Sequence, residues 1–287
     1  MGSILVTKAP GTTGRHVASG LATRGIAVKA ASRNPAIPVE GGAVPVVFDW
    51  DDRSTWAAAL DGVEAVYVVK PESEDVTGII RDFVGLAEES GAARIVLLSE
   101  IAAETRADDA HELQVERVVE QSKLDYAILR PNWFMQDLVD ERFFGNLIRE
   151  DGIIVMTTGG AAMSWIDARD IAAVAVELLA GGSCGRQALT LTGPDAFTLD
   201  QLATRVSAFA GTAVQPVEET TGAAEDRLKA GGAPAGFIEY FSNIGRSIIN
   251  GDTAFVTDAV ARVTGQSPRT LDAFLSEHAA SLQRSKG

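Results

Sequence analysis

The chain has 287 residues, of which 46% are hydrophobic and 22% charged, a composition typical of a soluble globular protein with a sizeable core. The formal net charge of −14 opposes binding to nucleic acid, since that affinity depends on Lys and Arg neutralising phosphates. No apolar run approaches the ~18 residues of a membrane span, and the N-terminal residues resemble no secretory signal. We therefore expect a cytoplasmic protein without a nucleic-acid or membrane partner.

A metal centre is not expected. The single cysteine, Cys184, cannot form an internal disulfide. The three histidines, His16, His111 and His278, are scattered along the chain and form no cluster with zinc-site spacing. The sequence therefore favours chemistry that needs no bound metal.

In the first 130 residues, short runs rich in β-branched residues alternate with segments of helical period. This alternation predicts an α/β fold with a doubly wound parallel sheet covered on both faces. Right-handed crossovers favour the strand order 3-2-1-4-5-6. The predicted strands are 4–7, 28–31, 44–48, 65–69, 95–99 and 126–129, and the predicted helices are 15–24, 54–60, 76–89 and 112–121.

After Pro131 the pattern becomes rich in helices. We expect residues 1–150 to form the sheet domain, and residues 151–287 to return one or two strands to it and form a smaller α+β lobe over the strand ends. The predicted helices are 134–149, 168–179, 199–209, 223–229, 237–249, 258–263 and 271–282, with short strands at 153–156 and 188–191.

The first strand leads into a glycine loop with one departure from the dinucleotide-binding pattern. Gly11 and Gly14 keep the spacing of G-x-x-G-x-x-G, but Lys8 occupies the first glycine position. In such loops the first glycine permits a tight turn, the second lets the backbone approach a pyrophosphate, and the third packs helix against strand. The strand before the loop and the helix after it support a Rossmann-type dinucleotide site in which two of these three roles survive.

Three interpretations of Lys8 remain open. The lysine could add a cation to a bound phosphate, fill a vacated adenosine site in an enzyme that no longer uses a dinucleotide, or be a neutral local change. Arg33, directly after the second strand, is a second cue, because an arginine there suits the 2′-phosphate of NADP whereas an acidic residue selects NAD. If a dinucleotide binds, NADP is favoured; the alternative for Arg33 is a solvated turn residue.

Several blocks of the sequence carry a family pattern, and the most specific are Leu-Arg-Pro-x-x-Phe-Met, which begins at Leu129, and Thr-Gly-x-x-Pro-Arg, which begins at Thr264. Together the blocks resemble the atypical short-chain dehydrogenase/reductases of the NmrA-like group. This group includes quinone and triphenylmethane reductases and the ergot-alkaloid festuclavine synthase and agroclavine dehydrogenase branch. The resemblance covers nearly the whole chain. Its blocks are 48–56, 63–69, 95–99, 126–136 and 256–270.

The resemblance implies a set of cofactor and substrate positions. In this family the loop after strand 1 holds the pyrophosphate, the arginine after strand 2 meets the 2′-phosphate, and the ends of strands 3 to 5 line the adenine and nicotinamide. By motif position the cofactor residues are Gly11, Thr12, Thr13, Gly14, Arg33, Asp49, Trp50, Pro71 and Ser99, together with Lys70 and Glu100 beside them. The substrate wall is Pro131, Asn132, Trp133 and Phe134, to which we add Met135 and Trp165; Phe143 and Phe144 are further apolar candidates.

The catalytic residues are harder to assign. The Tyr-x-x-x-Lys pair of ordinary short-chain dehydrogenases is absent, and His111 is the nearest candidate acid or base in the equivalent helix. The predicted strand order places Lys8, Lys70 and Glu100 at neighbouring strand ends, where they could form an acid/base or oxyanion-stabilising site. The alternative is a salt-bridge cluster that plugs a disused cofactor site.

Three functions compete. The first is a reductase of secondary metabolism that transfers hydride from NADPH to an iminium, quinone-like or conjugated electrophile. Its substrate would be aromatic or polycyclic, and the protein a monomer or homodimer. The second is a cyclase, isomerase or lyase on the same fold that has lost the dinucleotide and uses Lys8, Lys70 and Glu100. The third is a redox sensor like the regulatory members of the NmrA-like group.

Overall fold

The computed structural model describes residues 2–36, 41–101 and 110–283. Its chain divides into two compact units, neither of which is contiguous: unit 1 comprises 1–131, 168–191 and 259–266, and unit 2 comprises 132–167, 192–258 and 267–287. The first segment of the sheet unit ends at residue 131, whereas we expected a boundary at 150. Segments 168–191 and 259–266 of the second half of the chain belong to the sheet unit, and the return of one or two strands from that half was expected.

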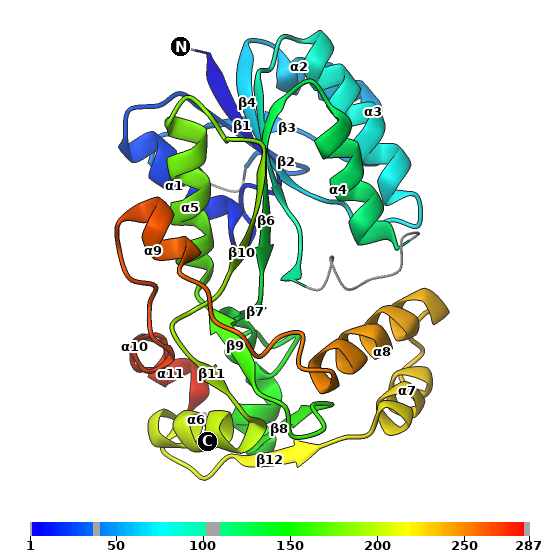
Figure 1. Cartoon of the computed structure of the whole chain (residues 1–287), viewed down its shortest axis with the longest axis vertical. Helices are drawn as coiled ribbons and strands as arrows, with labels where there is room; N and C mark the ends of the chain where they lie inside the picture. Colours follow the sequence, from blue (N-terminus) through cyan, green and yellow to red (C-terminus); the bar gives the residue numbers. More distant parts are fainter. Residues whose placement is uncertain (1, 37–40, 102–109, 284–287) are drawn as a thin grey trace. The chain divides into compact units, whose positions relative to one another are not determined.

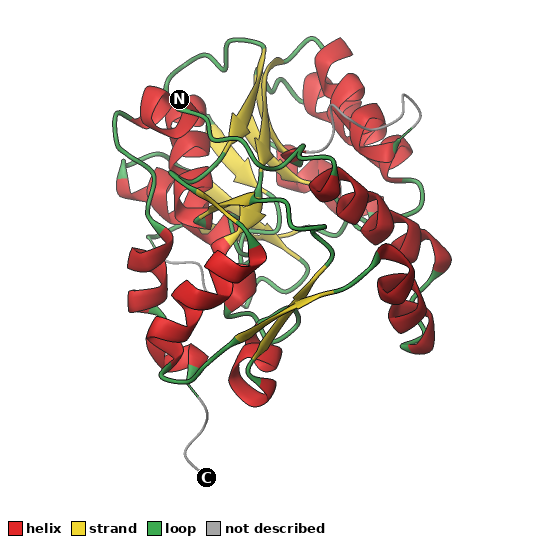
Figure 2. Ribbon diagram, turned by 60° about the horizontal axis from the view of Figure 1, so that its bottom comes forward, coloured by secondary structure: helices red, strands yellow, loops and turns green. Residues whose placement is uncertain are grey.

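Unit 1 is built on a seven-stranded parallel sheet of order β10-β6-β5-β4-β1-β2-β3. The predicted doubly wound sheet and its strand order are confirmed, and one further strand, β10, pairs in parallel with β6. Both faces are covered: α1, α5 and α9 lie on one and α2, α3 and α4 on the other (Figures 1 and 2). The strands are β1 (Ser3–Val6), β2 (Val28–Ser32), β3 (Val44–Val47), β4 (Val63–Val69), β5 (Arg94–Leu98), β6 (Asp125–Pro131) and β10 (Gln187–Leu191).

The helices of unit 1 begin and end within a few residues of their predicted positions. They are α1 (Gly14–Thr23), α2 (Trp56–Leu60) after the 3-10 turn η1 (Arg53–Thr55), α3 (Val76–Glu89), α4 (His111–Gln121), α5 (Ala168–Ala180) and α9 (Ala259–Thr264).

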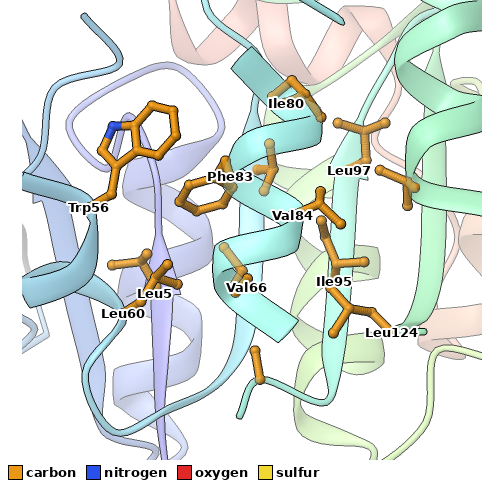
Figure 3. Close-up of a cluster of buried hydrophobic side chains, with 14 of the residues drawn as sticks. Leu5, Trp56, Leu60, Val66, Ile80, Phe83, Val84, Ile95, Leu97 and Leu124 are labelled. Atoms are coloured by element: carbon orange, nitrogen blue, oxygen red, sulfur yellow. The ribbon is translucent and has the colours of Figure 1, made fainter. Parts of the chain in front are cut away.

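An apolar core fills the layer between the sheet and α2, α3 and α4. Trp56 and Phe83 belong to it, both fully buried, with their ring centroids 5.6 Å apart in an edge-to-face arrangement (Figure 3). Leu5, Val66 and Ile95, from three neighbouring strands, belong to the same buried cluster. Burial of the central strands β1, β4 and β5 on both faces explains their nearly continuous apolar sequences, whereas the edge strand β3 is largely exposed.

Unit 2 contains two small sheets and several helices. A three-stranded sheet has the order β11-β9-β7, and β12 pairs in parallel with β8. Its strands are β7 (Trp133–Phe134), β8 (Ile153–Met156), β9 (Met163–Ile166), β11 (Ala196–Phe197) and β12 (Gln215–Glu218), of which only β8 was expected. Its helices are α6 (Leu199–Ala210), α7 (Thr221–Ala230), α8 (Ala235–Ile249), α10 (Leu271–Glu277) and α11 (Ala279–Leu282).

The predicted helix over 134–149 is wrong. The chain instead forms β7, the 3-10 turn η3 (Met135–Leu138) and a π-helical turn, η4 (Leu147–Asp151). Asp140 accounts for the break, because its side chain accepts a hydrogen bond from the backbone N–H of Arg142 at 2.9 Å and so competes with helical pairing. The predicted helix over 271–282 likewise divides in two, at His278.

Candidate functional site

The carboxyl ends of β1 and β4 are tied together by Thr7. Its backbone N–H donates to the carbonyl of Tyr67 at 3.0 Å, and its hydroxyl accepts from the N–H of Val69 at 2.8 Å. Because parallel neighbouring strands end at the same edge of the sheet, Lys8 and Lys70, each the next residue along, follow adjacent strand ends. In open α/β sheets this edge is where ligands bind.

A tight turn joins β1 to α1. The N–H of Gly11 donates to the carbonyl of Lys8 at 2.8 Å, and the N–H of Ala9 donates to Ala31 of β2 at 3.1 Å. A Cβ atom on Gly14 would lie 2.3 Å from the Lys8 carbonyl oxygen, so only glycine fits there. Gly14 thus has the close-approach role that its spacing predicted, whereas the pyrophosphate role of Gly11 stays a prediction.

The N-terminus of α1 offers backbone donors to an anion. Within the described part of the chain, the N–H groups of Thr12, Thr13 and Gly14 have no hydrogen-bond acceptor. Thr13 is held in place because its hydroxyl accepts a hydrogen bond of 3.0 Å from the buried Tyr67 hydroxyl. Free amides at the start of a helix of this length suit a phosphate group, so the turn fits a pyrophosphate despite Lys8.

Lys8 has a left-handed backbone, with φ of 46°, the conformation that explains why glycine is usual at this position. Its side chain is 41% exposed, and its ammonium lies 3.6 Å from a carboxylate oxygen of Glu72, which is 98% exposed. Glu72 lies in the loop after β4. The ion pair therefore spans the ends of β1 and β4.

The residues after β2 and β3 differ in whether their side chains are exposed to a ligand or engaged within the protein. Arg33 is exposed and has no ion-pair partner among the described residues. Asp49 is used locally, since its carbonyl accepts from Trp56 Nε1 at 2.8 Å and its carboxylate from the N–H of Asp51. Trp50 is 8% exposed, with its ring 5.0 Å from Phe83.

The indole nitrogen of Trp50 is buried and has no hydrogen-bond partner in the described structure. Trp50 is thus a core residue rather than an exposed part of a cofactor site. Pro71, after β4, is also buried.

A buried charged cluster lies at the ends of β5 and β6. The Ser99 hydroxyl donates to the carboxylate of Glu116, and the Arg130 guanidinium donates to both of its oxygens, the shortest contact being 2.6 Å. Glu116 is 1% exposed and Arg130 8%. Ser99, expected at the cofactor, is therefore also engaged within the protein.

Burial raises the pKa of Glu116 to about 7. The Ser99 hydrogen bond lowers this pKa, the Glu120 charge raises it, Lys70 lowers it and Glu100 raises it. Lys8 pairs with Glu72, whereas the charges of Lys70 and Glu100 act on the pKa of Glu116. The convergence of Lys8, Lys70 and Glu100 that the strand order suggested stays a prediction.

Sequence reasoning missed Glu116 and Glu72. Glu116 carried a signal, because on α4 it falls on the same face as Val115 and Val119, which are buried. A carboxylate on the apolar face of a helix indicates a buried partner. Glu72 carried none, since its partner is distant in sequence.

The predicted substrate wall lies mainly in unit 2 and contains an aromatic cluster. The ring of Trp133 lies 5.7 Å from that of Trp165 and 6.1 Å from that of Phe144. Trp165 is 0% exposed and Met135 1%, so both are core residues of this unit. The half-buried Trp133 and Phe134 remain available to a ligand.

Asn132 holds the start of this segment. Its side-chain amide donates to the Ser164 hydroxyl at 2.6 Å and to the carbonyl of Thr253 at 2.8 Å. Pro131 is buried at the end of β6. His111 begins α4, and its side chain lies outside the description.

Two features are absent from residues 2–36, 41–101 and 110–283. No group of three or more His, Cys, Asp or Glu side chains is placed to hold a metal ion. No helix is both long and apolar enough to cross a membrane.

The fold and site define an α/β protein of the dinucleotide-binding class. The defining features are the parallel sheet, the glycine turn with free amides before α1 and the arginine after β2. A family model described as NAD(P)H-binding matches residues 9–181. The chain belongs to this family, and within it to the atypical short-chain dehydrogenase/reductases of the NmrA-like group. The resemblance, the nicotinamide cofactor and the oxidoreductase class expected from the sequence are confirmed.

Relatives match along almost the whole chain. An NAD(P)H azoreductase of Xenophilus azovorans is 32% identical over 289 residues, 97% of this chain and 99% of that protein. Festuclavine synthase II of Penicillium roqueforti is 29% identical over 280 residues, 93% of this chain and 95% of that protein. The solved structure of an NADPH-dependent quinone oxidoreductase from Escherichia coli superposes with a TM-score of 0.82 at 22% identity, covering 96% of this chain and 99% of that one.

Proposed function

We propose that the protein is an NADPH-dependent reductase that transfers hydride to an iminium, quinone-like or conjugated electrophile of aromatic or polycyclic character. The observation that carries the proposal is the turn at Gly11 and Gly14, with its free amides for a pyrophosphate and Arg33 at the end of the neighbouring strand. When bound, the dinucleotide supplies the hydride. NADP is preferred to NAD because the exposed, positively charged Arg33 guanidinium can bind the negatively charged 2′-phosphate that only NADP carries.

The substrate class is supported by the relatives and by the missing tyrosine. Those relatives are named for azo reduction and festuclavine synthesis, and the structural neighbour for quinone reduction. Hydride addition to an already electron-poor acceptor needs less help from a protein acid than ketone reduction does. A chain without Tyr-x-x-x-Lys is therefore suited to such acceptors.

Within this proposal, Lys70 and Glu100 serve the reacting end of the crevice and His111 is a candidate proton donor. The electrostatic coupling of Lys70 and Glu100 to Glu116 supports a shared local field at the ends of β4 and β5. Glu116 itself is too buried to touch a substrate. It acts as a positioning residue for Ser99 and Arg130.

Two observations speak against the cofactor-free alternative that the sequence left open. The amides before α1 are free, and the Lys8 side chain is 41% exposed and paired with an exposed carboxylate rather than buried as a plug. No described feature favours the sensor alternative.

The test is to measure dissociation constants for NADPH and NADH by calorimetry, and then NADPH consumption with a quinone, an azo dye and a cyclic iminium. We expect NADPH to bind at least tenfold more tightly than NADH. Arg33→Met should remove most of this preference, whereas Arg81→Met, an exposed arginine on α3, should leave it unchanged. Absence of NADPH binding at millimolar concentration would refute the proposal.

A further inference from the structure

We infer that Lys8 and Glu72 form a charge clasp across the ends of β1 and β4, in which Glu72 holds the Lys8 ammonium until the pyrophosphate of the dinucleotide takes it. In this clasp Lys8 is a cofactor-binding residue, and Glu72 competes with the pyrophosphate for the Lys8 ammonium. This inference rests on the proposed function. It adds that Lys8, the one departure from the glycine-loop pattern, sets the affinity for the dinucleotide together with Glu72.

The geometry of the pair suits an exchangeable contact. At 3.6 Å, with side chains 41% and 98% exposed, the ion pair is loose and open to water. Exposed pairs of this kind contribute little stability and are readily broken. A doubly charged pyrophosphate offers the ammonium a stronger partner than a single solvated carboxylate does.

The backbone of Lys8 provides independent support. Its φ of 46° lies in the left-handed region, which glycine occupies freely and lysine does not. A glycine would therefore relieve strain at this position, yet the chain carries a long cationic side chain there. Strain that a common residue would remove is a reason to look for a function of the side chain.

The position of Lys8 relates it to the phosphate site. Its carbonyl accepts from the N–H of Gly11 and contacts Gly14, so Lys8 is part of the same turn as the free amides of Thr12 and Thr13. Pro10 removes one donor from this turn. The ammonium replaces that donor with a charge, which matters in a protein of formal net charge −14.

Lys8 and Arg33 should serve different phosphates. Lys8 lies toward β4 through its contact with Glu72, and Arg33 follows β2, on the opposite side of β1. The pyrophosphate is common to NADPH and NADH, whereas only NADPH carries the 2′-phosphate. Lys8 should therefore affect both dinucleotides equally, in contrast to Arg33.

The experiment is a double-mutant cycle with Lys8→Met, Glu72→Gln and the double variant of the full chain, read as dissociation constants for NADPH and for NADH. We expect Lys8→Met to weaken both about tenfold. Glu72→Gln should tighten both about two- to fivefold, and should have no effect once Lys8 is replaced. Glu74→Gln, an exposed carboxylate in the same loop, is the matched control and should change neither constant appreciably.

Each outcome decides one question. If the unmodified protein binds neither dinucleotide, the proposed function fails; if it binds both and Lys8→Met binds them equally well, the clasp is refuted. Weaker binding by Glu72→Gln, or equal tightening by Glu74→Gln, would also refute it. Should Lys8→Met fail to fold, Lys8→Gly replaces it, because glycine suits the left-handed backbone.

Discussion

The contact between Gly14 and Lys8 predicts the effect of a single methyl group. In Gly14→Ala the new Cβ would lie 2.3 Å from the Lys8 carbonyl oxygen, 2.9 Å from its carbonyl carbon and 3.0 Å from Ala9 Cα. All three are backbone atoms, which cannot rotate away as a side chain can. The turn between β1 and α1 must therefore open.

The expected cost follows from two opposing effects. Overpacking against backbone costs about 1–3 kcal/mol, and the better helix propensity of alanine returns at most about 1 kcal/mol. We expect a net loss of about 1–2 kcal/mol in the free energy of unfolding. Because opening the turn moves the amides of Thr12 and Thr13, NADPH binding should weaken at least tenfold.

Gly85→Ala is the matched control. Gly85 lies within α3, and a Cβ there would meet no atom within 4 Å, so alanine should stabilise the protein by about 1 kcal/mol and leave NADPH binding unchanged. Urea unfolding and calorimetric titration of both variants measure the two effects. A Gly14→Ala variant as stable as the unmodified protein, with the same NADPH affinity, would refute the reasoning.

Three further predictions concern strain and buried charge. Lys8→Gly should raise the free energy of unfolding by about 1 kcal/mol, by relief of the left-handed backbone, and should weaken dinucleotide binding. A lower free energy of unfolding, or an unchanged dinucleotide affinity, in parallel unfolding and binding assays would contradict this. At pH 8, above the pKa of about 7 that burial gives Glu116, Glu116→Gln should lower the free energy of unfolding by about 3 kcal/mol, because it leaves the Arg130 guanidinium buried beside a neutral group; an unchanged urea midpoint at that pH would argue against it. Burial raises the pKa of Asp137 to about 7 from 3.8, so this group favours the folded state at low pH, and the contribution is lost as pH rises from about 4 to 7. Asp137→Asn should therefore stabilise the protein at pH 8 by about 1–3 kcal/mol and flatten that part of its stability–pH curve, and a curve of the original slope would count against the assignment.

The sheet could be predicted because its signals are local and repeated. Apolar runs of four or more residues alternate with helical segments along the first 130 residues, and crossover handedness then leaves few strand orders. Strands of two residues, such as β7 and β11, are too short to show a period. The side chain of Asp140 ended an otherwise helical pattern through a hydrogen bond that composition alone does not reveal.

In the candidate site, too, local features were predictable from the sequence and long-range contacts were not. Gly11 and Gly14 were predictable from spacing, since their roles depend on neighbours within one turn. The partners of Lys8 and Arg130 were not, because each ion pair joins residues that are separate in sequence and meet only when the strands align.

The division of the chain into two interleaved units limits how it can be cut. The polypeptide passes between them five times, at 131/132, 167/168, 191/192, 258/259 and 266/267. A fragment that stopped at residue 150 would lack α5, β10 and α9, leaving the β6 edge unpaired and part of one sheet face uncovered. Such an edge invites aggregation, so the nucleotide-binding half could not be expressed, or exchanged between relatives, as one contiguous cassette.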